Sequence, residues 1–449
     1  MTEAGGAAHR CASRVPEPPL SVSRREFLSL SALATAGSVG RVRADLEPDL
    51  PQCGALPPSI AALASMRDQA HPITAAERAE RIARAQGLMR RQGLAAIVLT
   101  GGTSLEYFTA VRWGLSERLF ALAIPADGDA FVVCPAFEED RAREQLDLGP
   151  LGRAPVRAWD EDESPHRLLA DGLRERGAAT GTVGIEETVR FVFSDGLHAA
   201  APALTLASAT PVTAGCRTVK DEHEVALMRL ASAVTLKAYE AAYRALTAGM
   251  TQADVGRLVS QAHERLGFTG GASVQTGPYS ALPHGSATPQ EIREGTILLI
   301  DGGCTVEGYE SDISRTFVLG TPTDKMRRVF EIVHRAQAAA LAAARPGAEC
   351  QAVDAAARRV ITEAGYGPGF TYFTHRVGHG IGMDGHEWPY LVGGNTLPLL
   401  PGMAFSDEPG IYIPGEFGVR LEDDMVITPT GAELLTPQSP SLEEPFGAA

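Results

Sequence analysis

The chain has 449 residues, enough for two domains of ordinary size, and 44% of them are hydrophobic, so a sizeable core can form. Its formal net charge of −15 argues against nucleic acid as a partner, because that affinity depends on Lys and Arg contacts with phosphates. The six cysteines include no Cys-x-x-Cys pair, which excludes a zinc knuckle or thioredoxin-like site. A dense disulfide framework is not expected either, although one disulfide bond in an oxidising compartment stays open.

Residues 1–44 resemble a twin-arginine export signal rather than part of a fold. The stretch 23–28 reads Ser-Arg-Arg-Glu-Phe-Leu, a short apolar run follows at 30–39, and Val-Arg-Ala at 42–44 ends it as a small-residue cleavage site. The run is too short and too rich in Ser, Ala and Gly to span a bilayer, so no stable membrane insertion is expected. We therefore expect a periplasmic or secreted protein. The alternative is that this stretch is a disordered basic tail.

Residues 45–72 contain five prolines and predict a linker, followed by a first domain at 73–215. Thr74 and Glu77 form a capping box that predicts the start of a helix, and Gly93 predicts its end. Strands are predicted at 94–99, 119–124, 130–134 and 183–185, with an Asp-Gly turn between the second and the third. Mixed helices and strands without a chemical motif indicate a small α/β domain.

A second domain is predicted at 216–449. Long helical patterns that Gly or Pro closes cover 221–248, 252–266, 324–344 and 352–364. Strands are predicted between them at 296–300, 313–319, 403–405 and 419–427. Helices packed against a largely antiparallel sheet would make this an α+β domain.

Five potential metal ligands occur in short motifs of this second domain. They are Asp301, Asp312, His379, Glu408 and Glu422, in that order. Four carboxylates with one imidazole suit a pair of hard divalent ions such as manganese, and cobalt or zinc can also be held this way. A chain that concentrates acids around apolar strands is therefore a candidate dinuclear hydrolase.

Strand geometry predicts how some of these side chains meet. The apolar run 297–300 delivers Asp301 at its end, three glycines then let the chain turn, and the next strand carries Asp312 back. Arg420 and Glu422 are two residues apart on one predicted strand, so both point to the same face. A guanidinium beside a metal carboxylate can balance its charge or hold a substrate carboxylate, and both roles stay open. Singly, such residues are commonly turn or core groups, but their joint spacing favours a site.

These motifs resemble the creatinase/methionine-aminopeptidase pita-bread superfamily, and most closely its prolidases and Xaa-Pro aminopeptidases. The resemblance covers roughly residues 73–435 and rests on the Asp-x10-Asp pair, the His-x3-His-x6-His-Glu block, Glu-Pro-Gly and Arg-x-Glu-Asp. It implies a C-terminal pita-bread catalytic domain at 216–449, preceded by a smaller creatinase-type N-terminal domain, and thus an α+β fold overall.

The resemblance also implies the ligand roles. Asp301 would bind one ion through both oxygens, Asp312 and Glu422 would bridge two ions, and His379 and Glu408 would each bind one. Nothing in the ligand set is missing. Creatinase itself has lost such ligands, so the chain is expected to be metal-dependent rather than creatine-cleaving.

The other site residues follow from the same resemblance. His284 and His386 would stabilise the tetrahedral intermediate, and Glu408 would carry the proton to the leaving nitrogen. His375 and Arg420 would bind substrate or support the ligands.

The implied activity is hydrolysis of Xaa-Pro bonds by a dinuclear exopeptidase, either a dipeptidase or an aminopeptidase. One alternative keeps the metals and changes the bond to another C–N, ester or phosphotriester bond. A third reading is a non-catalytic binding module on the same fold, which the intact ligand set disfavours. The expected partners are proline-containing peptides and a second copy of the chain in a homodimer. The native metal is open.

Overall fold

A six-stranded mixed sheet forms the core of the N-terminal domain in the computed structural model, which describes residues 55–447. The strands lie in the order β4-β3-β2-β1-β5-β6. They are β1 (Leu94–Leu99), β2 (Ala121–Pro125), β3 (Phe131–Pro135), β4 (Val156–Trp159), β5 (Gly181–Ile185) and β6 (Leu204–Ser208). The helices are α3 (Ala75–Gln92), α4 (Thr103–Thr109), α5 (Glu139–Leu146), α6 (Pro165–Glu175), α7 (Phe191–Ala200) and α8 (Thr210–Arg217). The expected α/β character is confirmed.

Local sequence signals explain the first long helix and the strand after it. Glu77 N donates to Thr74 Oγ1, and Thr74 N donates to Glu77 Oε2 at 2.7 Å, so the predicted capping box is confirmed. Gly93 has a φ of 68°, the left-handed conformation that ends many helices. The strand predicted at 94–99 is β1 with the same bounds.

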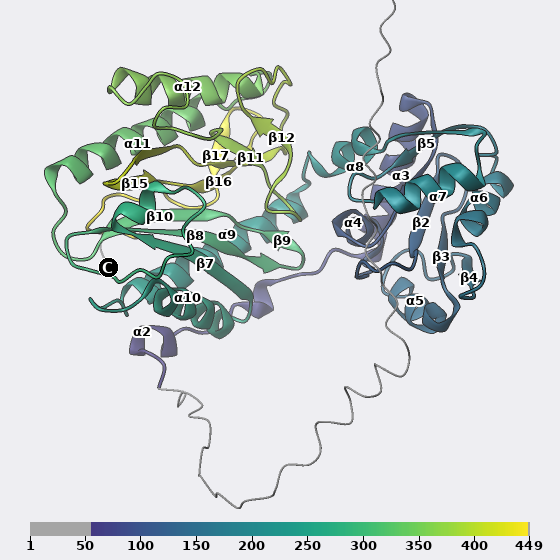
Figure 1. The fold of residues 1–449 in the computed structure, drawn as a ribbon, viewed down its shortest axis with the longest axis horizontal. Helices are drawn as coiled ribbons and strands as arrows, with labels where there is room; N and C mark the ends of the chain where they lie inside the picture. The colour runs from purple at the N-terminus through teal and green to yellow at the C-terminus, as the bar shows by residue number, and fades with distance from the viewer. Residues whose placement is uncertain (1–54, 448–449) are drawn as a thin grey trace, which may run out of the picture. The chain divides into compact units, whose positions relative to one another are not determined.

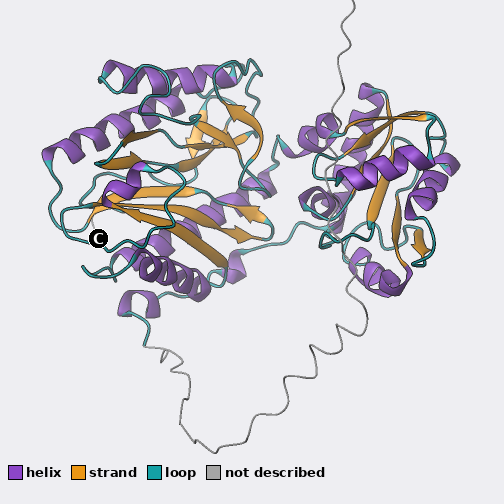
Figure 2. Cartoon of the chain, viewed as in Figure 1, coloured by secondary structure: helices purple, strands orange, loops and turns teal. Residues whose placement is uncertain are grey.

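Alternate residues of β1 pack into different hydrophobic cores. Ile97 belongs to a cluster with Met89 of α3, whereas Val98 belongs to a cluster with Leu169 of α6. Successive side chains on a strand point to opposite faces, so helices cover both faces of this sheet. Figure 2 shows these helices on both sides of the strands.

The C-terminal domain consists of antiparallel sheets and four long helices within the described residues. One sheet has the order β10-β8-β7 with β9 beside β8, a second has the order β12-β11-β13-β16-β17, and β14 pairs with β15. The strands are β7 (Thr269–Thr276), β8 (Ile297–Val306), β9 (Tyr309–Glu310), β10 (Ile313–Val318), β11 (Gly378–Gly380), β12 (Glu387–Leu391), β13 (Ala404–Asp407), β14 (Gly410–Ile413), β15 (Phe417–Arg420), β16 (Asp423–Ile427) and β17 (Ala432–Leu434). The helices are α9 (Glu222–Tyr243), α10 (Gln252–Leu266), α11 (Asp324–Ala343) and α12 (Cys350–Glu363).

Two helix pairs cover two different sheets of this domain. The α9 and α10 helices pack on β8 and β7, whereas α11 and α12 pack on the β11–β13 side. Figure 1 shows the two pairs at opposite sides of the strands, with the sheets between them. This arrangement confirms the expected α+β domain with a largely antiparallel sheet, and it leaves the ligand-bearing strands in the middle.

The described part of the expected linker packs on this domain. It contains the short helices α2 (Pro58–Ala61) and η1 (Arg67–Gln69). Ile60 is fully buried, and Met66 N donates to Leu266 O at 2.9 Å. Residues 56–72 therefore contact α9 and α10 instead of serving only as a connection.

The prediction that Asp301 ends its strand is wrong. β8 continues past it to residue 306, so Asp301 lies inside the strand. The glycines that follow serve close packing, because a Cβ on Gly303 would lie 1.7 Å from Ser311 O. The chain reverses later, at Glu307 and Gly308, whose φ values are 49° and 88°.

The single strand predicted at 419–427 is also wrong. The structure has two strands there, β15 and β16, which belong to different sheets. Glu422 lies between them and forms an isolated bridge with Ser314. The predicted common face is nevertheless present, because Arg420 Nε lies 3.7 Å from Glu422 Oε2.

The predicted export signal at 1–44 lies outside the described residues, as do Cys11 and Cys53. The four described cysteines form no disulfide bond. Between residues 55 and 447, no helix combines the length and the apolar character needed to cross a membrane.

Candidate metal centre

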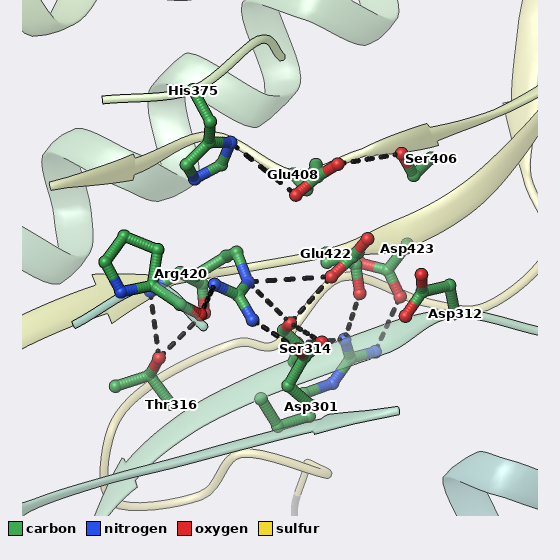
Figure 3. Close-up of polar contacts among 12 residues, drawn as sticks. Asp301, Asp312, Ser314, Thr316, His375, Ser406, Glu408, Arg420, Glu422 and Asp423 are labelled. Carbon is green, nitrogen blue, oxygen red and sulfur yellow. Dashed lines mark hydrogen bonds and ion pairs between the residues drawn. The ribbon is translucent and has the colours of Figure 1, made fainter. Parts of the chain in front are cut away.

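Asp301, Ser314 and Glu422 lie side by side on three adjacent backbone segments. Ser314 of β10 is paired with Asp301 of β8, and on its other side it bridges to Glu422. Residues directly opposite in antiparallel pairs point to the same face, so the three side chains converge (Figure 3). Ser314 Oγ lies 2.6 Å from Asp301 Oδ1 and 2.6 Å from Glu422 Oε2. The Ser314 hydroxyl has one proton and can donate it to only one of the two carboxylates at a time. The second carboxylate therefore needs a proton of its own or a nearby cation.

The remaining predicted ligands reach the same face. Asp312 precedes Ser314 by two residues, and strand alternation turns both to one side. Glu408 follows β13 and accepts a hydrogen bond from Ser406 Oγ at 3.2 Å. His379 of β11 completes the set, with its Nε2 3.2 Å from Glu408 Oε1 and 3.8 Å from Asp312 Oδ2.

Ligand atoms within 4.8 Å of one another form three overlapping groups: Asp301, Asp312 and Glu422; His379, Glu408 and Glu422; and Asp312, His379 and His386. The first two groups contain all five predicted ligands and share Glu422. His379 Nδ1 lies 3.1 Å from Gly380 O, which only accepts hydrogen bonds, so Nδ1 carries a proton. Nε2 then faces the carboxylates. Burial alone would lower the pKa of His379, but the hydrogen bond with Glu408 raises it, so Nε2 also carries a proton here, and a metal ion would take the place of that proton.

The carboxylates carry more negative charge than their described neighbours balance. Burial, and after it the charge of Asp301, raises the pKa of Asp312 well above its usual range. Burial and the charge of Asp312 likewise raise the pKa of Glu422. Burial alone would raise the pKa of Glu408 too, but the hydrogen bond with His379 lowers it to about 2. Divalent cations among these oxygens would relieve the repulsion, so the donor set fits a divalent metal centre.

Arg420 is 4% exposed and its guanidinium is engaged by the site. Nη2 lies 2.5 Å from Asp301 Oδ2, and Nε donates to Ser314 Oγ at 2.8 Å. Nη1 donates to Tyr412 OH at 3.1 Å and to Pro283 O at 3.0 Å. A guanidinium with most of its donors in use has little left for a substrate carboxylate, so this geometry favours a supporting role over a clamp.

His375 lies beside Glu408 as a neutral imidazole. Its Nδ1 is 2.8 Å from Arg376 O and 3.7 Å from Glu408 Oε2, and its Nε2 is 2.7 Å from Tyr412 OH. Burial lowers the pKa of His375, so Nδ1 donates to the carbonyl and Nε2 accepts from the tyrosine. Tyr412 thereby connects His375 to Arg420.

The ring of His386 is stacked on that of His379, with centroids 3.6 Å apart and planes 16° apart. Partial burial, and after it the charge of His379, lowers the pKa of His386. His284 lies in the exposed loop between β7 and β8. Of the predicted pair, the structure therefore places His386 at the edge of the ligand cluster.

Three polar residues at this site were not predicted: Ser314, Asp424 and Tyr412. The first two had a signal in the sequence, because each follows a predicted ligand, Asp312 or Glu422, by two strand positions. Asp424 Oδ2 accepts from Asp312 N at 3.1 Å, and burial raises the pKa of Asp424 to about 7. Tyr412 had no such signal, because β14, which carries it, was not predicted.

Family models match both domains of the chain. Residues 226–429 match metallopeptidase family M24. Residues 81–219 match the creatinase/prolidase N-terminal domain.

Named relatives cover most of the chain. The probable dipeptidase PepE of Mycobacterium tuberculosis is 38% identical over 360 residues, which cover 79% of this chain and 93% of that protein. An Xaa-Pro dipeptidase of Lactobacillus delbrueckii subsp. lactis is 34% identical over 374 residues, which cover 80% of this chain and 97% of that protein. The crystal structure of dipeptidase PepE from Mycobacterium ulcerans matches with a TM-score of 0.77 at 36% identity, covering 83% of this chain and 99% of that one. A Thermococcus sibiricus prolidase structure matches with a TM-score of 0.72 at 29% identity, and the match covers 80% of this chain and 97% of that one.

Proposed function

The chain belongs to metallopeptidase family M24, and from this premise we propose that it hydrolyses Xaa-Pro bonds with two divalent ions. The observation that carries the proposal is the convergence of five ligands on one face, in groups whose ligand atoms lie within 4.8 Å: Asp301, Asp312, His379, Glu408 and Glu422. Similarity to an Xaa-Pro dipeptidase over most of both chains supports the substrate class.

Two groups of residues would hold the ions. Asp301, Asp312 and Glu422 surround one position, and His379, Glu408 and Glu422 surround the other. When bound, such ions polarise the scissile carbonyl and lower the pKa of the attacking water. Arg420 and Ser314 keep the carboxylates in place through the contacts with Asp301 described above.

Glu408 is the residue that we assign to proton transfer. The lowered pKa of Glu408 keeps it ionised. Its Oε1 accepts a hydrogen bond from Ser406 Oγ, and its Oε2 lies 3.7 Å from His375 Nδ1. A carboxylate in this place can accept a proton from the attacking water and deliver it to the leaving proline nitrogen. This role needs its pKa to be retuned when the ions bind.

His386 and His284 are the donors that we assign to the developing oxyanion. A neutral imidazole retains one N–H donor, so the lowered pKa of His386 is compatible with this role. A preorganised donor of this kind typically contributes about 3 kcal/mol to a transition state.

The substrate class has a physical reason. The amide before a proline has no N–H, so peptidases that hold the substrate through that donor handle it poorly. A site that acts on the scissile carbonyl through metals and histidine donors does not need the missing N–H.

The test is hydrolysis of Gly-Pro, Ala-Pro and Ala-Pro-Pro by metal-stripped protein refilled with manganese, cobalt or zinc, with Gly-Ala as the control without proline. We expect metal-dependent cleavage of Xaa-Pro substrates and slow cleavage of Gly-Ala. Release of alanine from the tripeptide assigns an aminopeptidase, and cleavage of the dipeptides alone assigns a dipeptidase. Protein with two ions bound that cleaves none of them contradicts the proposal.

We favour manganese among the three ions, because four of the five ligands are carboxylates and hard oxygen ligands suit it. Metal analysis of protein purified without added metal measures this directly. Zinc or cobalt in that sample would correct the assignment.

We propose export by the twin-arginine route. The motif with Arg24 and Arg25 supports it, and Lys lacks the guanidinium fork that we expect the export receptor to read. Changing both arginines to lysine should retain the precursor in the cytoplasm. Equal periplasmic amounts of variant and wild type would show that 1–44 is no export signal.

We also propose that the protein is a homodimer, on the strength of the resemblance to prolidases. Sedimentation equilibrium at micromolar concentration measures the mass. A mass near 47.4 kDa, that of one chain, would contradict the proposal.

A further inference from the structure

The segment 381–386 between β11 and β12 carries His386 at its end. The His386 ring stacks on His379 and is otherwise exposed. The ring's position therefore depends on where the backbone of this segment is held. Misplacing a catalytic group by about 1 Å can cost roughly a hundredfold in rate, so the contacts of this backbone matter for catalysis.

Two acids beside His386 are held by cations, one from the last residue of α8 and one from the connection between α8 and α9. Arg217 Nη2 lies 2.5 Å from Asp384 Oδ2 and also pairs with Glu387 Oε2. Lys220 Nζ lies 2.5 Å from Glu387 Oε1. The side chains of Arg217, Lys220 and Glu387 are 9%, 2% and 7% exposed. Solvent screens the pairs of Glu387 only weakly, whereas the pair of Arg217 with Asp384 is partly open to solvent.

Further contacts fasten the same segment within the unit of residues 56–449. Thr103 Oγ1 donates to the second oxygen of Asp384, Oδ1, at 2.5 Å. Glu310 N donates to Gly382 O at 2.7 Å. A Cβ on Gly382 would lie 2.7 Å from Glu387 Oε1, so the glycine lets the segment approach that carboxylate closely.

We propose that Arg217 and Lys220 are positioning residues, which hold Asp384 and Glu387 and so fix His386 at the metal centre. This inference rests on the proposed function, since it gives these ion pairs a role in the proposed reaction through His386. Neither cation touches the five ligands in these contacts. A purely structural role for the cluster is the competing account, and it predicts losses that do not depend on His386.

The variants need to separate positioning from folding. Arg217→Gln leaves the buried Glu387 and the half-exposed Asp384 with less compensation and can prevent folding. Asp384→Asn is milder, because the Asp384 side chain is 41% exposed. The matched control is Glu433→Gln, which removes a carboxylate charge from an ion pair with Arg229 at 2.6 Å, where both side chains are about half exposed.

Asp384→Asn should lower kcat about tenfold to a hundredfold while KM and the metal content stay near wild type. Glu433→Gln should leave all three unchanged. In the His386→Ala background, Asp384→Asn should cost less than about threefold, because the ring that it positions is gone. The same fold-loss in both backgrounds would overturn the proposal.

Hydrogen exchange of metal-free protein gives a readout that needs no substrate. Peptides covering 381–386 should exchange faster in Asp384→Asn than in wild type, and the control should match wild type. Unchanged exchange in this segment would overturn the anchoring itself. If wild type cleaves no Xaa-Pro substrate, the proposed function fails, and the exchange result still decides whether Asp384 anchors the segment.

Discussion

Arg420 Nη2 lies 2.5 Å from Asp301 Oδ2, and the guanidinium is buried with its other donors directed to protein atoms. A predicted ligand is therefore held by an arginine two positions before another predicted ligand, Glu422. Because the contact fixes one Asp301 oxygen, the arginine affects how that carboxylate presents itself to an ion.

Arg420→Ala should weaken metal binding by about ten- to a hundredfold, the usual scale for losing a group that orients a ligand. Dipeptides and tripeptides should then lose turnover by similar factors. Metal titration and kinetics on both substrate lengths measure this. A raised KM for dipeptides alone, with normal metal affinity, would instead show that Arg420 binds the substrate carboxylate.

Ser314→Ala should also reduce metal affinity, by roughly tenfold, because Asp301 and Glu422 lose the hydroxyl between them. Competition with a chelator of known affinity gives the change. Ser194→Ala in α7 is a control outside the site. Equal affinities of the Ser314 variant and wild type would mean that Arg420 alone orients Asp301.

His386→Ala should keep two ions and lose turnover by about two to three orders of magnitude, the scale of one oxyanion donor. The structure makes this test sharper, since His386 lies within ligand distance of Asp312 and His379. Metal content and kcat are measured on the same sample. Loss of an ion would reassign His386 as a ligand.

His263 gives a pH dependence away from the ligands. Burial lowers its pKa from 6.5 to about 4, and its side chain is 0% exposed. The unfolded chain binds the proton more readily, so this contribution to the free energy of unfolding is complete above pH 6.5 and is lost as the pH falls from 6.5 to about 4. The full loss is on the order of 3 kcal/mol.

His263→Gln should therefore lose less stability than wild type between pH 7.5 and pH 5. Urea unfolding of metal-free protein at both pH values gives this loss in the free energy of unfolding for the variant and for wild type. Equal losses in the two proteins would mean that His263 is not responsible for the acid sensitivity.

Much of the fold could be predicted because its signals are local. The capping box at Thr74 and the left-handed Gly93 set the ends of α3, and periodic apolar positions gave α10 the same bounds in prediction and structure. The five predicted ligands could be picked out because their short motifs resemble those of the family, and residues two apart such as Arg420 and Glu422 were expected on one face from local geometry alone.

The rest depends on contacts between distant segments. Gly-rich β7 has few residues that favour a strand, so only its pairing with β8 reveals it. The ion pair of Arg217 and Glu387 joins residues 170 positions apart, and no local pattern marks it. Asp301 was placed at a strand end because glycine usually signals a turn, whereas Gly303 is needed here for close backbone approach.

The metal content of Asp312→Ala, measured together with Ala-Pro hydrolysis, tests the dinuclear centre most directly. Asp312 is partly buried beside Asp301 and Glu422, so its loss would leave two cations with one carboxylate fewer to offset their mutual repulsion. We predict two ions per chain in wild type, and loss of metal and turnover together in the variant, with metal-free Tm no lower because one repelling carboxylate is gone. Two bound ions and full activity in Asp312→Ala would contradict the account.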